Sequence, residues 1–191
     1  TLINRYVNAG DSKVLAEFED KGLLEILIQN EGISEEENGA LGGNEAVAEA
    51  IENNIRRIIV DNNPLNPKFY ENLSQILDEL IEQRKKGALD YEKYLKEVIN
   101  LAKQLQTKNT NNIYPPEINS DGKRAIYDNF SQDINWIARL DEIIKTYKSD
   151  GYIGNKMKER ELMRTIKPLS DEKGVDIDKL FELIKLQEDY Q

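Results

Sequence analysis

The spacing of the apolar side chains constrains the fold most, because these side chains recur every three or four residues along nearly the whole chain. A period of 3.6 residues is typical of amphipathic α-helices, and no run of alternating apolar and polar residues indicates a β-strand. The sequence therefore predicts an all-α fold, an irregular helical bundle of about seven to eight helices. The expected helical segments are 12–29 (one or two helices), 45–60, 67–86, 91–105, 123–131, 132–148, 155–167 and 176–190.

The clearest pair of helices lies within 66–105. Asn66 is expected to cap a helix that begins at Pro67, where the missing N–H costs nothing, and Gly87 is expected to end it. Asp90 is then expected to cap the next helix. Because the link between the two helices is short, they are predicted to form a long antiparallel helical hairpin.

A glycine-rich, acidic stretch at 30–44, NEGISEEENGALGGN, is typical of a loop or linker. It divides the chain into an N-terminal helical segment with this flexible loop, 1–44, and a C-terminal helical domain, 45–191.

The chain starts at Thr1 without a targeting signal, which suggests a piece of a longer polypeptide. Its longest apolar run, 23–28, is too short to cross a bilayer, so no membrane association is expected, and the lack of cysteine fits a cytoplasmic location.

Composition removes several kinds of chemistry. The 191 residues include no cysteine and no histidine, which excludes Cys/His zinc sites, cysteine nucleophiles and histidine-based triads. A formal net charge of −10 disfavours nucleic-acid binding unless the cations gather on one face. The acidic pairs Asp141/Glu142 and Asp78/Glu79 are expected to be solvated on helix surfaces. Five aromatic residues are expected in the core: Tyr91, Tyr94, Tyr127, Phe130 and Trp136.

The stretch PPEINSDGK, 115–123, contains a pattern found in nuclease metal sites, an acidic residue followed by D-x-K. In such a site two carboxylates, here Glu117 and Asp121, would hold a divalent metal, and Lys123 would stabilise developing negative charge. That geometry depends on β-strands, and no strand pattern surrounds this stretch. A turn and helix cap over 119–122 is the favoured interpretation.

The stretch DGYIGNKMKERELMR, 150–164, combines two glycines with a basic helix. A P-loop needs G-x-x-x-x-G-K-[ST] after a strand, whereas here the glycines are three apart and Met157 occupies the position nearest to the hydroxyl. The favoured interpretation is a helix capped by Asn155 and ended by Pro168, with no nucleotide, metal or other cofactor site in this fragment. Residues 156–167 nevertheless carry five cations and two carboxylates, so a docking face for an acidic partner or for nucleic acid stays open.

Three segments together resemble a known family. NPKFYENLSQILDELIEQRKKGALDYEKYLKEVINLAKQL (66–105), YPPEINSDGKRAIYDN (114–129) and DGYIGNKMKERELMRTIK (150–167) precede a final LFELIKLQEDY. Over about residues 45–191 this order resembles the C-terminal region of the R (restriction) subunit of type I restriction–modification enzymes. The shared patterns are N-P-x-x-Y-E with L-I-E-x-R, Y-P with A-x-Y-D-N, and D-G-(aromatic)-x-G-N-x-x-K-E-R. Tyr152 stands where the family more often has tryptophan.

The resemblance implies a part of an enzyme. Such R subunits carry a nuclease domain and two helicase-like motor domains that use ATP and Mg²⁺, and their helical C-terminal region is associated with docking onto the methyltransferase–specificity core. The expected partners are therefore the methyltransferase and specificity subunits and the other domains of the parent chain, with no catalytic site in this fragment. The expected contact residues are Tyr152, Asn155, Lys156, Lys158, Arg160 and Arg164.

Two other functions are weighed against docking. The basic helix at 156–167 could instead contact duplex DNA within the motor, which predicts weak binding that falls steeply with salt. A free-standing enzyme that uses carboxylates alone is disfavoured, because no catalytic constellation is found.

Overall fold

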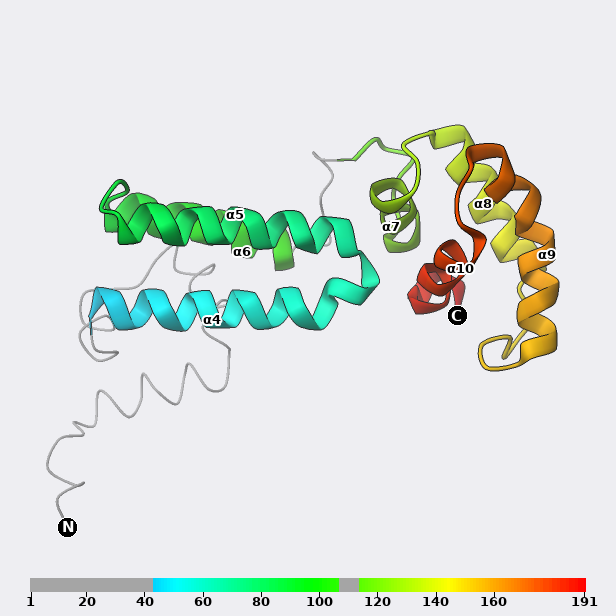
Figure 1. The fold of residues 1–191 in the computed structure, drawn as a ribbon, viewed down its shortest axis with the longest axis horizontal. Coiled ribbons are helices and arrows are strands. Elements are labelled where there is room, and N and C mark those ends of the chain that lie inside the picture. Colours follow the sequence, from blue (N-terminus) through cyan, green and yellow to red (C-terminus); the bar gives the residue numbers. More distant parts are fainter. Residues whose placement is uncertain (1–42, 107–113) are drawn as a thin grey trace, which may run out of the picture. The chain divides into compact units, whose positions relative to one another are not determined.

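The computed structural model describes residues 43–106 and 114–191, and within these ranges every regular element is a helix (Figure 1). The α-helices are α4 (Asn44–Asn62), α5 (Pro67–Lys85), α6 (Tyr91–Gln106), α7 (Asp121–Asn129), α8 (Ile134–Tyr147), α9 (Lys156–Lys173) and α10 (Ile177–Leu186). Two 3₁₀ turns, η2 (Asn63–Leu65) and η3 (Glu188–Tyr190), follow α4 and α10. The all-α prediction is confirmed, and the elements are consistent with an irregular helical bundle. The helices expected within 12–29 lie outside the described residues.

The chain divides into two compact units, which we describe separately. Among the described residues, the first unit contains 43–60 and 73–106, and the second contains 61–72 and 114–191. The domain boundary expected at residue 44 adjoins residues that the structure does not describe, and it stays a prediction.

In the first unit, a nearly buried carboxylate joins three helices. Glu52 of α4 accepts hydrogen bonds from the Arg84 guanidinium of α5 at 2.9 Å and from the Tyr94 hydroxyl of α6 at 2.7 Å. The guanidinium also lies over the Tyr94 ring, 5.2 Å from its centroid, and pairs with Glu45 at 2.6 Å. The end of α5 and the start of α6 therefore meet at this point. Antiparallel packing of the two helices along their length, as the hairpin requires, stays a prediction.

The helix ends around 66–90 follow the expected local rules. Gly87 adopts the left-handed conformation with φ +67°, and the amides of Gly87 and Ala88 donate to the carbonyls of Arg84 and Gln83 beyond the last turn of α5. The Asp90 carboxylate accepts the Lys93 amide at 2.9 Å, which caps α6.

The core of the second unit lies between α7, α8, α9 and α10, with α8 packed on α9, α9 on α10 and α7 on α8 (Figure 1). Trp136 is fully buried, and its indole N–H donates to the Leu169 carbonyl at 2.8 Å. The core side chains include Ile126, Trp136, Leu140, Ile144, Tyr152, Leu162, Ile166, Leu180, Ile184 and Tyr190. Of the five aromatic residues expected in the core, Tyr94 of the first unit and Trp136 are fully buried, Tyr127 and Phe130 are partly buried and pack against the core of the second unit, and Tyr91 is half-buried.

The expectation that Pro168 ends the basic helix is wrong. Helix α9 runs on to Lys173, although a proline cannot donate the backbone hydrogen bond of its position. The residues directly after the proline, Leu169 and Ser170, are buried, and their packing offsets the lost hydrogen bond. The helix ends instead at Gly174, which has φ +64°.

Two segments that carry the family resemblance meet in one polar cluster of the second unit. Asp128 accepts hydrogen bonds from the Asn66 amide at 2.6 Å and from the Tyr114 hydroxyl at 2.5 Å. Asn129 donates to Asn66 at 2.7 Å and accepts the Lys68 amide at 3.2 Å. The expected cap at Asn66 forms as well, since its oxygen accepts the Phe69 amide at 3.4 Å. The cluster attaches the start of α5 to α7.

We predict that Asp128→Asn leaves the protein at least as stable as the wild type at pH 7. The asparagine oxygen can accept both hydrogen bonds, and the substitution removes a half-buried charge. Asp128→Ala, in contrast, leaves the two donors without an acceptor and should lower the free energy of unfolding by about 2 kcal/mol. Urea unfolding of the two variants checks both expectations.

The same variants should respond differently to pH. Burial raises the pKa of the Asp128 carboxyl above its ordinary 3.8. Because this pKa is higher in the folded than in the unfolded chain, protonation stabilises the folded state. The advantage of Asp128→Asn over the wild type should therefore be largest near pH 7 and narrow as the pH falls through the raised pKa. An advantage that grows on acidification would contradict this assignment.

Candidate functional site

The glycine-containing segment before α9 is a helix entrance in which the chain itself supplies acceptors for several backbone amides. Gly151 and Gly154 have φ of +62° and +81°, which lets the chain turn into the helix. The Asn155 side chain accepts the Met157 and Lys158 amides at 3.1 and 3.3 Å, and the Gly154 amide donates to the Glu159 carboxylate at 2.9 Å. The predicted Asn155 cap is confirmed. These three amides are therefore already engaged by acceptors of the chain itself.

Tyr152 does not lie where a partner could reach it. Its side chain is 2% exposed and contacts Phe181 edge-on, with the ring centroids 6.3 Å apart. Among the six contact residues expected from the sequence, Tyr152 is therefore corrected to a core residue. Burial raises the pKa of its hydroxyl, which makes no hydrogen bond within the described part of the chain. The position needs an aromatic ring and does not use the hydroxyl.

Three cations of α9 are engaged inside the chain. Lys158 donates to the Asp150 carbonyl at 2.6 Å, which ties the helix to the preceding loop. Lys167 pairs with Asp171 one turn further along, at 2.7 Å, and Lys173 pairs with Asp133, also at 2.7 Å. All three are therefore less available to a partner than their charge suggests.

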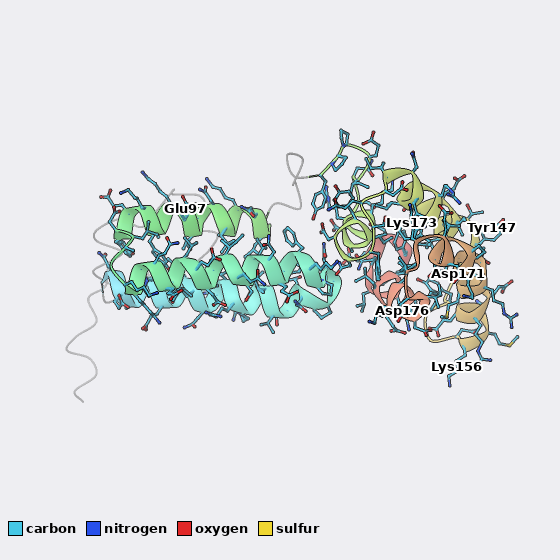
Figure 2. All side chains as sticks on the ribbon, turned by 45° about the horizontal axis from the view of Figure 1, so that its top comes forward. Glu97, Tyr147, Lys156, Asp171, Lys173 and Asp176 are labelled. Atoms are coloured by element: carbon cyan, nitrogen blue, oxygen red, sulfur yellow. The ribbon has the colours of Figure 1, made fainter. Side chains whose placement is uncertain are left out.

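The other three cations of α9, Lys156, Arg160 and Arg164, form what we call the basic row. All three are exposed, and their side chains make no hydrogen bond or ion pair with any residue of 43–106 or 114–191. They stand four residues apart, so they lie along one face of the helix over about 12 Å. Figure 2 shows Lys156 at the end of α9 remote from Asp171 and Lys173. The basic row can bind carboxylates or phosphates, the arginines in a two-pronged geometry.

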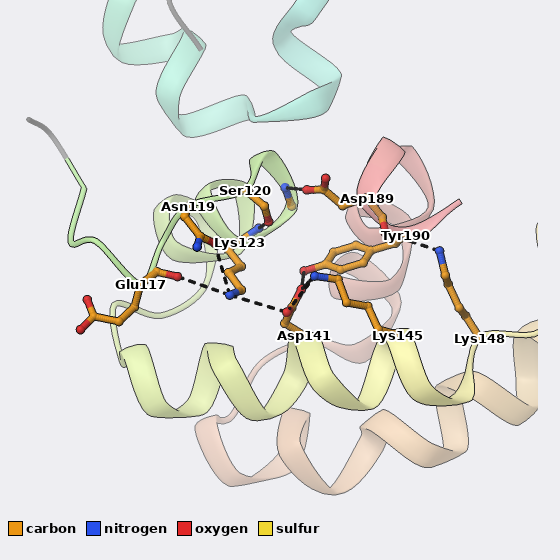
Figure 3. A network of polar contacts seen from close by, with 10 residues as sticks. Glu117, Asn119, Ser120, Lys123, Asp141, Lys145, Lys148, Asp189 and Tyr190 are labelled. Carbon is orange, nitrogen blue, oxygen red and sulfur yellow. Dashed lines mark hydrogen bonds and ion pairs between the residues drawn. The ribbon is translucent and has the colours of Figure 1, made fainter. Parts of the chain in front are cut away.

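The three residues of the possible nuclease site, Glu117, Asp121 and Lys123, do not come together in the structure. Asp121 pairs with Arg124 at 3.1 Å, and Lys123 approaches the backbone carbonyl of Glu117 at 3.4 Å, while the Glu117 carboxylate points away (Figure 3). Ser120 accepts the Lys123 amide, so the expected cap is confirmed, while Asp121 and Gly122 already belong to the first turn of α7. The described residues contain no group of three or more acidic side chains placed to hold a metal ion.

The expectation that Asp141 is solvated on a helix surface is wrong, because the residue is only 7% exposed. Its carboxylate accepts the Tyr190 hydroxyl at 3.0 Å, pairs with Lys145 at 2.9 Å and lies 3.6 Å from Lys123 (Figure 3). Its neighbour Glu142 is exposed, as predicted. Asp141 therefore attaches the C-terminal turn to α7 and α8, and its role is structural.

The sequence reasoning missed this attachment of the C-terminal turn. Asp189 accepts the Gly122 amide at the start of α7 at 2.7 Å, and Lys148 donates to the carbonyls of Asp189 and Gln191 at 3.4 and 2.6 Å (Figure 3). A glycine within the first turn of a helix was the available signal, because it marks a close approach. Here a Cβ on Gly122 would lie 2.6 Å from the Tyr190 ring.

Comparison of the chain with protein-family models, curated proteins and solved structures finds no match. The resemblance to the restriction subunit therefore stays a prediction. No helix in the described ranges is long and apolar enough to cross a membrane.

Gly122→Ala should destabilise the protein by about 1–3 kcal/mol, because the new methyl group forces the Tyr190 ring off the Asp141 carboxylate. Without that contact, alanine would stabilise a helix by about 1 kcal/mol, so the sign of the change is diagnostic. Urea unfolding measures it, and a more stable variant would contradict the packing described here.

Asn155→Ala should lower the free energy of unfolding by about 1 kcal/mol, since the amides of Met157 and Lys158 lose their acceptor. Asn155→Ser keeps an acceptor oxygen and serves as the matched control, with stability close to that of the wild type. Thermal unfolding of both variants tests the assignment. Equal loss in the two variants would show that Asn155 acts by something other than capping.

Proposed function

We propose that this chain is a non-catalytic docking module that attaches the ATP-dependent, DNA-translocating endonuclease subunit of a type I restriction enzyme to its methyltransferase–specificity core. The observation that carries the proposal is the basic row: Lys156, Arg160 and Arg164 are exposed and have no partner among residues 43–106 and 114–191. The ATP and Mg²⁺ chemistry of the parent enzyme belongs to other domains in this proposal. A cytoplasmic location is part of the same proposal.

The electrostatics favour an acidic partner. The chain carries 36 acidic and 26 basic residues, so carboxylates were plentiful for pairing with every cation. Like charges four residues apart on a helix repel each other, by about 0.2–0.5 kcal/mol per pair. The basic row therefore costs the isolated helix stability, and a surface rich in carboxylates removes that cost on binding.

The sequence resemblance supplies the identity of the partner. Its third segment, 150–167, includes the whole basic row as well as the Asn155 cap that begins the helix. In restriction subunits the corresponding helical region is associated with docking to the methyltransferase–specificity core. The row gives this segment a surface on which such a contact could form.

Duplex DNA is the second candidate partner, because successive cations of the row are about 6 Å apart along the helix and could each approach a phosphate. The net charge of −10 opposes this candidate. The salt dependence of binding distinguishes duplex DNA from an acidic protein partner. Three phosphate contacts give a slope of about −2.7 in log K against log salt, so raising the salt from about 50 to about 200 mM would weaken DNA binding about 40-fold.

Arg160→Glu should weaken binding to the cognate methyltransferase–specificity complex at least about tenfold, because it places a carboxylate against an acidic surface. The complex is immobilised and the chain titrated over it, with and without DNA. Lys179→Glu is the matched control: it makes the same charge change at an exposed position in the first turn of α10, where an acid is favourable.

The control variant should bind as the wild type does, and DNA should not alter the affinity. No binding to the complex, together with retention on duplex DNA that is lost steeply with salt, would reject the docking proposal in favour of DNA contact.

A further inference from the structure

An exposed methionine lies on the same face of α9 as the basic row. The Met157 side chain is 81% exposed, more than any other large apolar side chain of the described residues. Most apolar side chains of this unit are buried between helices, so Met157 stands out by its exposure and by its surroundings. Ile153, in the turn just before the helix, is 43% exposed as well.

Helix geometry places Met157 among the arginines. Arg160 follows it by three residues and Arg164 by seven, which are the spacings of neighbours on one helix face. The opposite face is fixed by burial of Leu162 and Ile166 in the core. Met157, Arg160 and Arg164 therefore share a single surface, with Lys156 at its edge.

We propose that Met157, Arg160 and Arg164 form the centre of a protein–protein interface, and that the partner presents an apolar recess bordered by carboxylates. The inference rests on the proposed function and specifies the chemistry of the surface that the module binds. Met157 fills the recess, and the two guanidiniums pair with the carboxylates at its border. Lys156, at the end of the helix, contributes to the rim.

The composition of this surface favours protein over nucleic acid. Methionine and arginine are enriched in protein interfaces, and arginine is enriched among the residues that carry most of the binding energy. Methionine is also unbranched and polarizable, so it fills irregular apolar recesses well. A row of phosphates offers charge but no apolar recess, and Met157 would stay in water beside it.

The size of the expected effect follows from burial. Moving a methionine side chain out of water changes an equilibrium by about tenfold to a hundredfold. This contribution does not depend on charge, so it persists at high salt, whereas pairing of the exposed arginines with carboxylates weakens as salt screens it. Salt therefore separates the contribution of Met157 from that of the arginines.

The test measures affinity for the cognate methyltransferase–specificity complex at 0.15 and 0.5 M salt. Met157→Gln keeps the length and helix preference of the side chain but makes its end polar. It should bind at least about tenfold more weakly at both salt concentrations, while Met157→Leu should stay within about threefold of the wild type. The double variant Arg160→Gln/Arg164→Gln should lose most at 0.15 M and less at 0.5 M.

Lys167→Gln is the control within the same helix, because Lys167 is exposed but pairs with Asp171. Its affinity should match that of the wild type. Since Met157 is exposed, its variants should unfold at the wild-type temperature, which separates loss of binding from loss of folding.

The possible outcomes are distinct. If the wild type does not bind the complex, the proposed function fails and this inference fails with it. If the wild type binds and Met157→Gln binds equally well, docking stands and the inference is overturned. If the isolated chain self-associates and Met157→Gln abolishes this, the face belongs to a second copy of the chain, which also overturns the inference.

Discussion

Burial of one face of α9 determines which of its side chains reach solvent, and the candidate docking surface depends on that. Leu162, Ile166 and Leu169 pack into the core of the second unit, and the Trp136 indole donates to the backbone of Leu169. A helix held along one stripe cannot rotate about its axis, so the opposite stripe stays in water. The same packing carries the helix through Pro168, which on local preference alone would have ended it. Position and length of the surface thus follow from apolar contacts and not from its charges.

Once the helix is fixed, its charges fall into two groups. Lys158, Lys167 and Lys173 are bound to the chain itself, Lys158 through a loop carbonyl and the other two through carboxylates. Lys156, Arg160 and Arg164 have no such contact within the part of the chain that the structure describes. These three cations lie around an exposed methionine on one face, and the contacts of the described residues do not explain why that surface exists. The contacts thus distinguish the cations that the chain itself binds from those of the basic row, whereas the sequence shows only how many cations the helix carries.

The sequence predicted what depends on near neighbours. The caps at Asn66, Asp90 and Asn155 were predicted correctly, because each needs only an acceptor and an amide two or three residues on. It failed where the deciding contact is distant in sequence. The buried position of Asp141 depends on Tyr190, which lies 49 residues away. Tyr152 was expected to contact a partner, because its packing against Phe181 could not be predicted from the sequence. The sequence likewise could not show which cations of α9 pair within the chain and which form the basic row.

Most residues behind the family resemblance have a structural role. Asn66, Tyr114, Asp128 and Asn129 form one polar cluster, Arg84 binds Glu52, and Tyr190 packs against Gly122. Any chain that keeps these contacts can keep the fold, whatever it binds. Among the exposed side chains of the candidate docking surface, Arg160 belongs to the shared pattern, while Met157 and Arg164 lie outside it and are free to differ between partners. The resemblance therefore concerns mainly the fold. The identity of the partner depends on the exposed face of α9, and the shared patterns include only part of that face.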